Sequence, residues 1–143
     1  MSFITETDIK VISRIENLDE YGLAEGDIER SESVYHAYIK DIEGGVSISY
    51  TEHDESGERI TSELTVADGR VTLKRMGAIT TEMRFAEGEE NDTLYSVGPY
   101  SFDAKVVTKR VKGDIGRLGG EISIHYELTV GGASKRIQLR VVA

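Results

Sequence analysis

Two charged residues stand where the surrounding pattern calls for apolar ones. Apolar side chains alternate with polar ones over residues 46–50, and the same face continued by two positions reaches Glu52. The face formed by Val71 and Leu73 reaches Arg75 in the same way. An unpaired charge on an inward face is costly, so each of the two needs a partner or contact with water at a rim. The planar fork of an arginine suits a carboxylate, either that of Glu52 or that of an acidic ligand.

Three tyrosines accompany these charges. Tyr50, Tyr95 and Tyr126 project from inward faces, and their hydroxyls need polar partners when buried. With Glu52 and Arg75 they form the candidate site, which has two interpretations. It is either a structural polar cluster that closes one end of a barrel, or the polar floor of a ligand cavity in which Arg75 receives an acidic head group.

Other kinds of chemistry find little support. The chain has no cysteine, which excludes thiol nucleophiles and thiolate metal sites, and no Gly-x-Ser-x-Gly turn. His53 lies in an acidic hairpin turn, His125-x-Glu127 offers two ligands on a polar face without a third, and the register of His36 is open. The glycine-rich stretch 113–120 matches no nucleotide-binding fingerprint and is predicted to be a flexible loop. We therefore expect no metal and no cofactor, and an enzyme is not the favoured class.

Charge is unevenly distributed along the 143 residues, whose net charge is −9. Residues 1–69 carry 17 acidic and 5 basic side chains, whereas residues 70–143 carry 9 acidic and 12 basic ones. A strongly negative protein repels nucleic acid and anionic membranes, so neither is an expected partner. The basic residues of the second half are predicted to form a solvated face that pairs with the acidic half or with a second copy in a homodimer: Lys105, Lys109, Arg110, Lys112, Arg117, Lys135, Arg136 and Arg140.

Strands must position the candidate site, because alternation with a period of two dominates the sequence. Clear runs cover 46–51, 60–66, 70–74, 79–85, 122–130 and 136–141, and weaker ones cover 9–16, 28–33, 34–41, 93–98 and 100–112. Turn residues separate them at Gly44-Gly45, 55–57, Asp68-Gly69, Gly98-Pro99 and Gly131-Gly132. No long segment has helical period, and residues 19–27 are expected to hold a helical turn at most.

These spacings are typical of an antiparallel meander. We predict an all-β fold, an up-and-down (meander) β-barrel of about eight to ten strands, because closure removes the two sheet edges. A two-sheet sandwich is the alternative. Residues 1–143 are expected to form a single domain. No run of about 20 apolar residues suggests a membrane span, and the start lacks the features of a signal peptide, so we expect a cytoplasmic protein.

Several short segments resemble the YwiB-like family, a bacterial family of uncharacterised β-barrel proteins. The resemblance covers about three quarters of the chain and rests on residues 48–52, 73–77, 83–85 with Gly88, 95–100 and 120–126. It implies a calycin-like, lipocalin-type barrel and supplies no catalytic residues, since the family has no established activity. It also implies that Tyr50, Glu52, Arg75 and Gly77 belong to the family pattern.

Two functions follow as hypotheses. The first is a cytoplasmic barrel that binds a small apolar or amphiphilic ligand, for which the aliphatic interior and the five polar candidates would serve. The alternative is a filled structural barrel that acts as a protein-interaction or dimerisation module without ligand or catalysis. A filled interior would contradict the first hypothesis.

Overall fold

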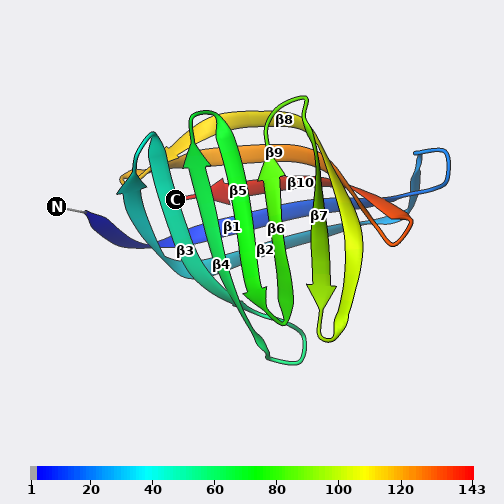
Figure 1. The fold of residues 1–143 in the computed structure, drawn as a ribbon. Coiled ribbons are helices and arrows are strands. Elements are labelled where there is room, and N and C mark those ends of the chain that lie inside the picture. The colour runs from blue at the N-terminus through cyan, green and yellow to red at the C-terminus, as the bar shows by residue number, and fades with distance from the viewer. Residues whose placement is uncertain (1–2) are drawn as a thin grey trace.

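Ten strands make up the fold of this computed structural model, which describes residues 3–143 (Figure 1). They are β1 (Ile4–Leu18), β2 (Ala24–Ile42), β3 (Gly45–His53), β4 (Arg59–Ala67), β5 (Arg70–Gly77), β6 (Ile79–Phe85), β7 (Glu90–Val97), β8 (Tyr100–Gly116), β9 (Gly119–Val130) and β10 (Ala133–Val142). No helix long and apolar enough to cross a membrane occurs in the part of the chain that the structure describes.

Each strand pairs antiparallel with the next along the chain, and β1 pairs with β10 to close the barrel. The predicted all-β meander barrel is therefore confirmed, and the two-sheet sandwich is excluded. Every strand overlaps an alternating segment, because a sheet with one face in the core and one in water needs that period.

The tight turn at Asp68-Gly69 shows how local residues set the register. Ala67 pairs with Arg70, so the two residues between them form the whole turn, with φ of 53° and 75°. Positive φ at both central positions defines the turn whose twist matches the flanking strands, and aspartate followed by glycine is a preferred pair for it. Gly98-Pro99 and Gly131-Gly132 also connect directly paired strands.

The first hairpin is longer than the alternation suggested. The weak runs at 28–33 and 34–41 belong to one strand, and residues 24–27, expected to hold a helical turn at most, begin it. The carboxylate of Asp19 accepts hydrogen bonds from the backbone N–H groups of Tyr21 and Leu23, and these bonds close the turn within residues 19–23. Residues 24–32 of β2 are exposed, so the alternation at 28–33 is weak and residues 24–27 carry no sign of a strand in the sequence.

The expectation of a flexible loop over residues 113–120 is wrong. Strand β8 continues to Gly116 and β9 begins at Gly119, with only two residues in the turn. Gly113 adopts φ of +90°, and a Cβ there would lie 2.3 Å from the carbonyl oxygen of Glu121. The glycines therefore allow two backbones to approach closely within a twisted ladder, a role that composition alone does not distinguish from flexibility.

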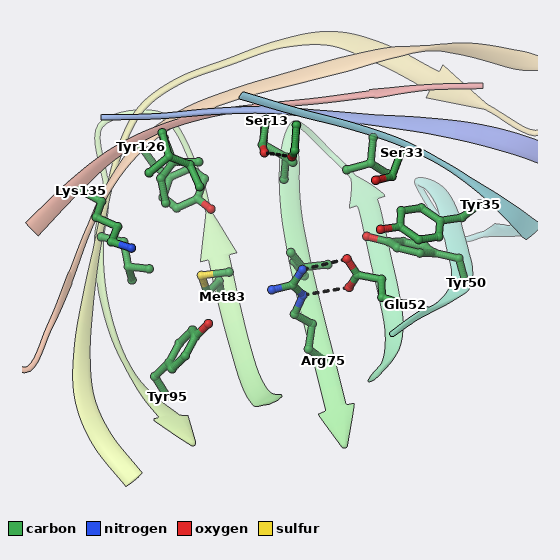
Figure 2. A pocket seen from close by; sticks show the side chains of 17 residues that line it. Ser13, Ser33, Tyr35, Tyr50, Glu52, Arg75, Met83, Tyr95, Tyr126 and Lys135 are labelled. Atoms are coloured by element: carbon green, nitrogen blue, oxygen red, sulfur yellow. Dashed lines mark hydrogen bonds and ion pairs between the residues drawn. The ribbon is translucent and has the colours of Figure 1, made fainter. Parts of the chain in front are cut away.

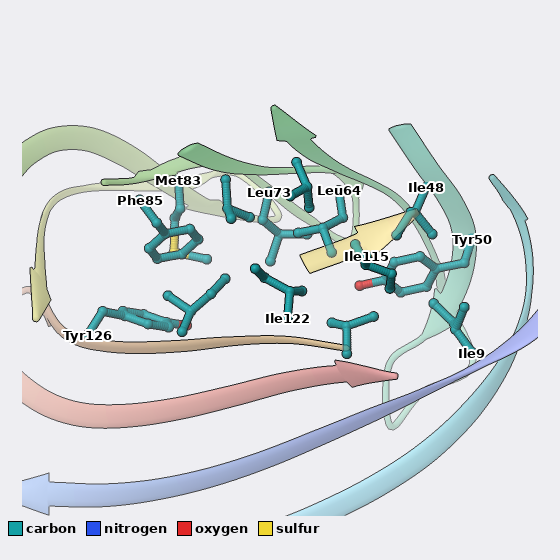
Figure 3. Packing of buried hydrophobic residues seen from close by; sticks show 14 of the residues in the cluster. Ile9, Ile48, Tyr50, Leu64, Leu73, Met83, Phe85, Ile115, Ile122 and Tyr126 are labelled. Carbon is teal, nitrogen blue, oxygen red and sulfur yellow. The ribbon is translucent and has the colours of Figure 1, made fainter. Parts of the chain in front are cut away.

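The half of the barrel near the chain termini is packed with aliphatic side chains (Figure 3). The fully buried members come from both sides of the barrel: Ile9, Ile39, Ile48, Leu64, Val71, Phe85, Val106, Ile122, Ile124 and Val141. The ring of Phe85 lies 4.6 Å from that of Tyr126, centroid to centroid, and the two rings form one boundary of this core. A pocket of about 330 Å³ lies at the edge of this core, where Val66, Val71 and Ile122 meet the turn at Asp68-Gly69 and the backbone of Gly113.

Thr108 is a buried polar residue of the core that lacks a hydrogen-bond partner for its hydroxyl among the described residues. Its hydroxyl is buried without a hydrogen-bond partner, next to a bulge in β8 between Thr108 and Arg110. A buried hydroxyl without a partner costs about 1–3 kcal/mol, so we expect Thr108→Val to raise the free energy of unfolding by about 1–2 kcal/mol. Chemical denaturation measures the change.

The matched control is Thr81, which is equally buried but donates its hydroxyl to the carbonyl of Leu94 at 3.0 Å. Thr81→Val is expected to lower the free energy of unfolding, by about 1 kcal/mol, because it leaves that carbonyl without its donor. Equal effects of the two substitutions would show that the Thr108 hydroxyl is not an unpaired group.

Candidate functional site

The barrel opens where its strands diverge. The ladder between β2 and β3 covers only Ala37–Ile42 of β2, whereas β2 itself begins at Ala24. Paired β1 and β2 therefore run on past the end of that ladder, together with β9 and β10, as the long ribbons on the right of Figure 1 show. This divergence leaves an opening between β2 and the ends of β3 and β5.

A cavity of about 240 Å³ lies beneath this opening. Eight of the ten strands contribute to its walls, and only β4 and β8 do not. The lining residues are Val11, Ser13, Ile15, Ser31, Ser33, Tyr35, Tyr50, Glu52, Leu73, Arg75, Met83, Tyr95, Tyr126, Leu128, Lys135, Ile137 and Leu139. All five candidates from the sequence, Tyr50, Glu52, Arg75, Tyr95 and Tyr126, are among them.

Glu52 and Arg75 form a two-pronged ion pair across the intervening strand β4 (Figure 2). The Arg75 Nε donates to Glu52 Oε2 at 3.1 Å, and its Nη2 donates to Oε1 at 3.0 Å. Ser62 on β4 pairs in register with Arg75 and donates its hydroxyl to Glu52 Oε2 at 2.7 Å. The small side chain of Ser62 leaves room for the longer residues of β3 and β5 to meet above it.

Burial and charge set the ionisation of this cluster. Burial disfavours the charge of Arg75, but the adjacent Glu52 carboxylate outweighs this and the pKa of the guanidinium is raised. Burial also raises the pKa of the phenols of Tyr50 and Tyr126. Arg75 is therefore a permanent cation, and both phenols are neutral groups that can donate a hydrogen bond at physiological pH.

Polar groups converge on the side of Arg75 that faces away from Glu52. Figure 2 shows the Arg75 guanidinium directed towards Met83, with the hydroxyls of Tyr95 and Tyr126 and the amino group of Lys135 around the same space. Within residues 3–143, Arg75 Nη1 and the hydroxyls of Tyr95 and Tyr126 form no side-chain hydrogen bond with another protein group. The arrangement can receive an acceptor, and an anionic one above all.

The sequence analysis missed several lining residues. Lys135 could have been found, because the inward face of Ile137 and Leu139 continued by two positions reaches it, the rule that identified Glu52 and Arg75. Tyr35 belongs to the alternation of Ala37 and Ile39 and stacks on Tyr50 at 5.2 Å between ring centroids. The serines at positions 13, 31 and 33 give no such signal, since small polar residues fit either face of a strand.

The remaining candidates lie outside the cavity. His36 is exposed between Glu6 and Asp8, which raise its pKa through hydrogen bonds. No cluster of three residues suited to a metal ion occurs among the described residues. Basic side chains of the second half of the chain form ion pairs. Two of these pairs join the acidic first half, Arg117 with Asp41 and Arg136 with Glu16. Two others stay within the second half, Lys105 with Glu90 and Arg140 with Glu121.

Comparison with known proteins agrees with this fold. A family model described as a domain of unknown function (DUF1934) matches residues 19–140. The uncharacterized beta-barrel protein YwiB of Bacillus subtilis (strain 168) is 30% identical over 94 residues, which span 66% of this chain and 64% of YwiB. The crystal structure of the YwiB protein from Bacillus subtilis matches with a TM-score of 0.76 and 24% identity, over 96% of this chain and 92% of that one.

Proposed function

The chain belongs to the DUF1934 family, as its resemblance to YwiB predicted, and from this premise we propose that it is a cytoplasmic barrel that binds a small apolar or amphiphilic molecule. The observation that carries the proposal is the contrast between the two halves of the interior. One half holds most of the fully buried aliphatic side chains, and the other holds a 240 Å³ cavity lined by convergent polar groups.

The composition of the cavity supports a binding role. Ligand sites are typically apolar with a few placed polar groups that fix orientation, and here aliphatic residues from β1, β5, β9 and β10 surround a single buried ion pair. A barrel that served folding alone would gain stability by filling this space, since empty volume forfeits packing contacts.

The volume of the cavity limits the part of a ligand that the barrel can enclose. The cavity measures about 240 Å³. This is below the roughly 300–1,000 Å³ of common drug-sized sites, so the ligand is a small molecule or the end of a longer one.

A second candidate function is an interaction module, and one feature of β2 favours it. On the side away from β1, residues 24–36 of β2 pair with no described strand, because the ladder with β3 begins at Ala37. An unpaired strand edge offers backbone donors and acceptors to a further strand. Glu25, Asp27, Glu29 and Glu32 make this edge acidic, which opposes pairing with a second copy and favours a basic partner segment.

Native mass spectrometry of the protein purified gently from its own cells tests the proposal. We expect an added mass that leaves on activation. Ser33 lies on the cavity wall, so the bulky side chain of Ser33→Trp is expected to abolish the added mass. Ser101 is exposed on the surface, so Ser101→Trp should keep the added mass. A bare mass for the wild-type protein would contradict ligand binding, and a bare dimer or a bound polypeptide would favour the interaction module.

A further inference from the structure

Resting on the proposed function, we infer the chemical class of the ligand: a monocarboxylic acid with a short apolar tail. Its carboxylate would lie end-on against Arg75 and accept hydrogen bonds from the hydroxyls of Tyr95 and Tyr126. The inference is drawn from the donors left free in the cavity, the sum of the charges that line it, and the apolar walls beyond them.

The free donors of Arg75 have the geometry of a second carboxylate site. A guanidinium carries five N–H groups in one plane. Glu52 uses Nε–H and one hydrogen of Nη2, which form the side edge of the group. The other hydrogen of Nη2 and both hydrogens of Nη1 remain, and the free Nη2 hydrogen with one Nη1 hydrogen forms the end edge of the fork. This edge binds a carboxylate through two parallel hydrogen bonds.

The two phenols supply further donors at the same place. In Figure 2 the hydroxyls of Tyr95 and Tyr126 point into the space beyond Nη1, on either side of Met83. Tyr126 is 5% exposed, and its hydroxyl stays protonated in these surroundings, so it donates rather than accepts when an anion is present. Three strands, β5, β7 and β9, thus direct one cation and two neutral donors towards one small volume.

The charge of the lining favours a ligand with one negative charge. Three ionisable acids and bases other than tyrosine line the cavity, namely Glu52, Arg75 and Lys135, and their sum is +1. A bound carboxylate would bring the total charge in the cavity to zero. A phosphate monoester with two negative charges would bring it to −1, and an unbalanced charge is costly to remove from bulk water. Lys135 is exposed at the rim, where it attracts the anion without the cost of burial.

The remaining walls suit an apolar tail. Seven apolar side chains contribute to them: Val11, Ile15, Leu73, Met83, Leu128, Ile137 and Leu139. The cavity volume of about 240 Å³ restricts this tail to a short chain or a single ring. A long-chain acid would leave its end in the opening beside the serines of β1 and β2.

Isothermal titration calorimetry of the purified protein, first freed of bound small molecules, tests the inference with octanoate, octanamide and octyl phosphate. We expect octanoate to bind at least about tenfold more tightly than the other two, because two charge-assisted hydrogen bonds form only with the carboxylate and only its single charge is matched. Tyr126→Phe is expected to weaken octanoate binding several-fold, whereas Tyr100→Phe, on the surface, leaves it unchanged.

The outcomes separate this inference from the function on which it rests. Octanamide binding as tightly as octanoate would overturn the acid class while leaving a ligand-binding barrel. Tighter binding of octyl phosphate would replace the monoanion with a dianion. If none of the three binds and the native mass of the protein is bare, both the inference and the proposed function are wrong.

Discussion

Replacing Arg75 with methionine is expected to lower the free energy of unfolding by about 3–5 kcal/mol, the cost of leaving a buried charge without its partner. The Glu52 side chain is 11% exposed, and after the substitution only the Ser62 hydroxyl would still donate to it. Methionine fills similar volume, so the loss measures the stranded carboxylate more than a void. Equilibrium unfolding in urea at neutral pH gives the value.

The double variant Glu52→Gln/Arg75→Met distinguishes the pair from other causes. With both charges removed, much of the lost stability should return, because a neutral amide is far less costly to bury than a carboxylate. Arg70→Met is the matched control, since Arg70 also forms a two-pronged contact, through Nη1 and Nη2, with Glu89 at the surface. It should cost about 1 kcal/mol or less. Failure of the double variant to recover would rule out the stranded charge as the cause.

Phe85→Ala is expected to cost about 3–5 kcal/mol, the range for removing a buried aromatic ring. Phe85 is 1% exposed and packs against Tyr126, which lines both the core and the cavity. The substitution would leave a void beneath Tyr126 that its neighbours on rigid strands cannot close. The change in the midpoint of urea unfolding, at constant slope, measures this loss.

Phe102→Ala is the control for this substitution. Phe102 is 43% exposed, so the same change in chemistry should cost much less there. The Phe85 variant should also weaken octanoate binding, because the Tyr126 ring loses the surface that fixes its hydroxyl. A loss below about 1 kcal/mol would show that the neighbouring side chains refill the space and that Phe85 does not separate core from cavity.

Alternation identified the strands only where one face is buried. Residues 46–53 were readable because Val46, Ile48 and Tyr50 all face the core. Residues 24–32 form an exposed part of β2, so the sequence marks them only by the weak alternation at 28–33 and not at all over 24–27. The ladder at Gly113 was hidden for a different reason, since glycine serves a close backbone approach and a flexible loop equally well.

The site could be predicted to the extent that it consists of exceptions to this alternation. Glu52 and Arg75 stood out as charges on inward faces, and the same rule applied to β10 would have added Lys135. Tyr35 continues the inward face of Ala37 and Ile39 and could have been added in the same way as the other tyrosines, whereas the serines of β1 and β2 fit either face and nothing in the sequence marks them. The cavity itself also had no signal, because its presence depends on whether the inward side chains of facing walls meet.

The sequence by itself determined which way each side chain points, the order of the strands and the two charges that need a partner, because these depend on a period of two and on short turns. Only the tertiary structure decided which of those side chains share a space. Closure of β1 on β10 and the early divergence of β2 from β3 fix the distance between walls. Where opposite walls are close, aliphatic side chains fill the barrel, and where β1 and β2 lead away, they leave a cavity around Arg75.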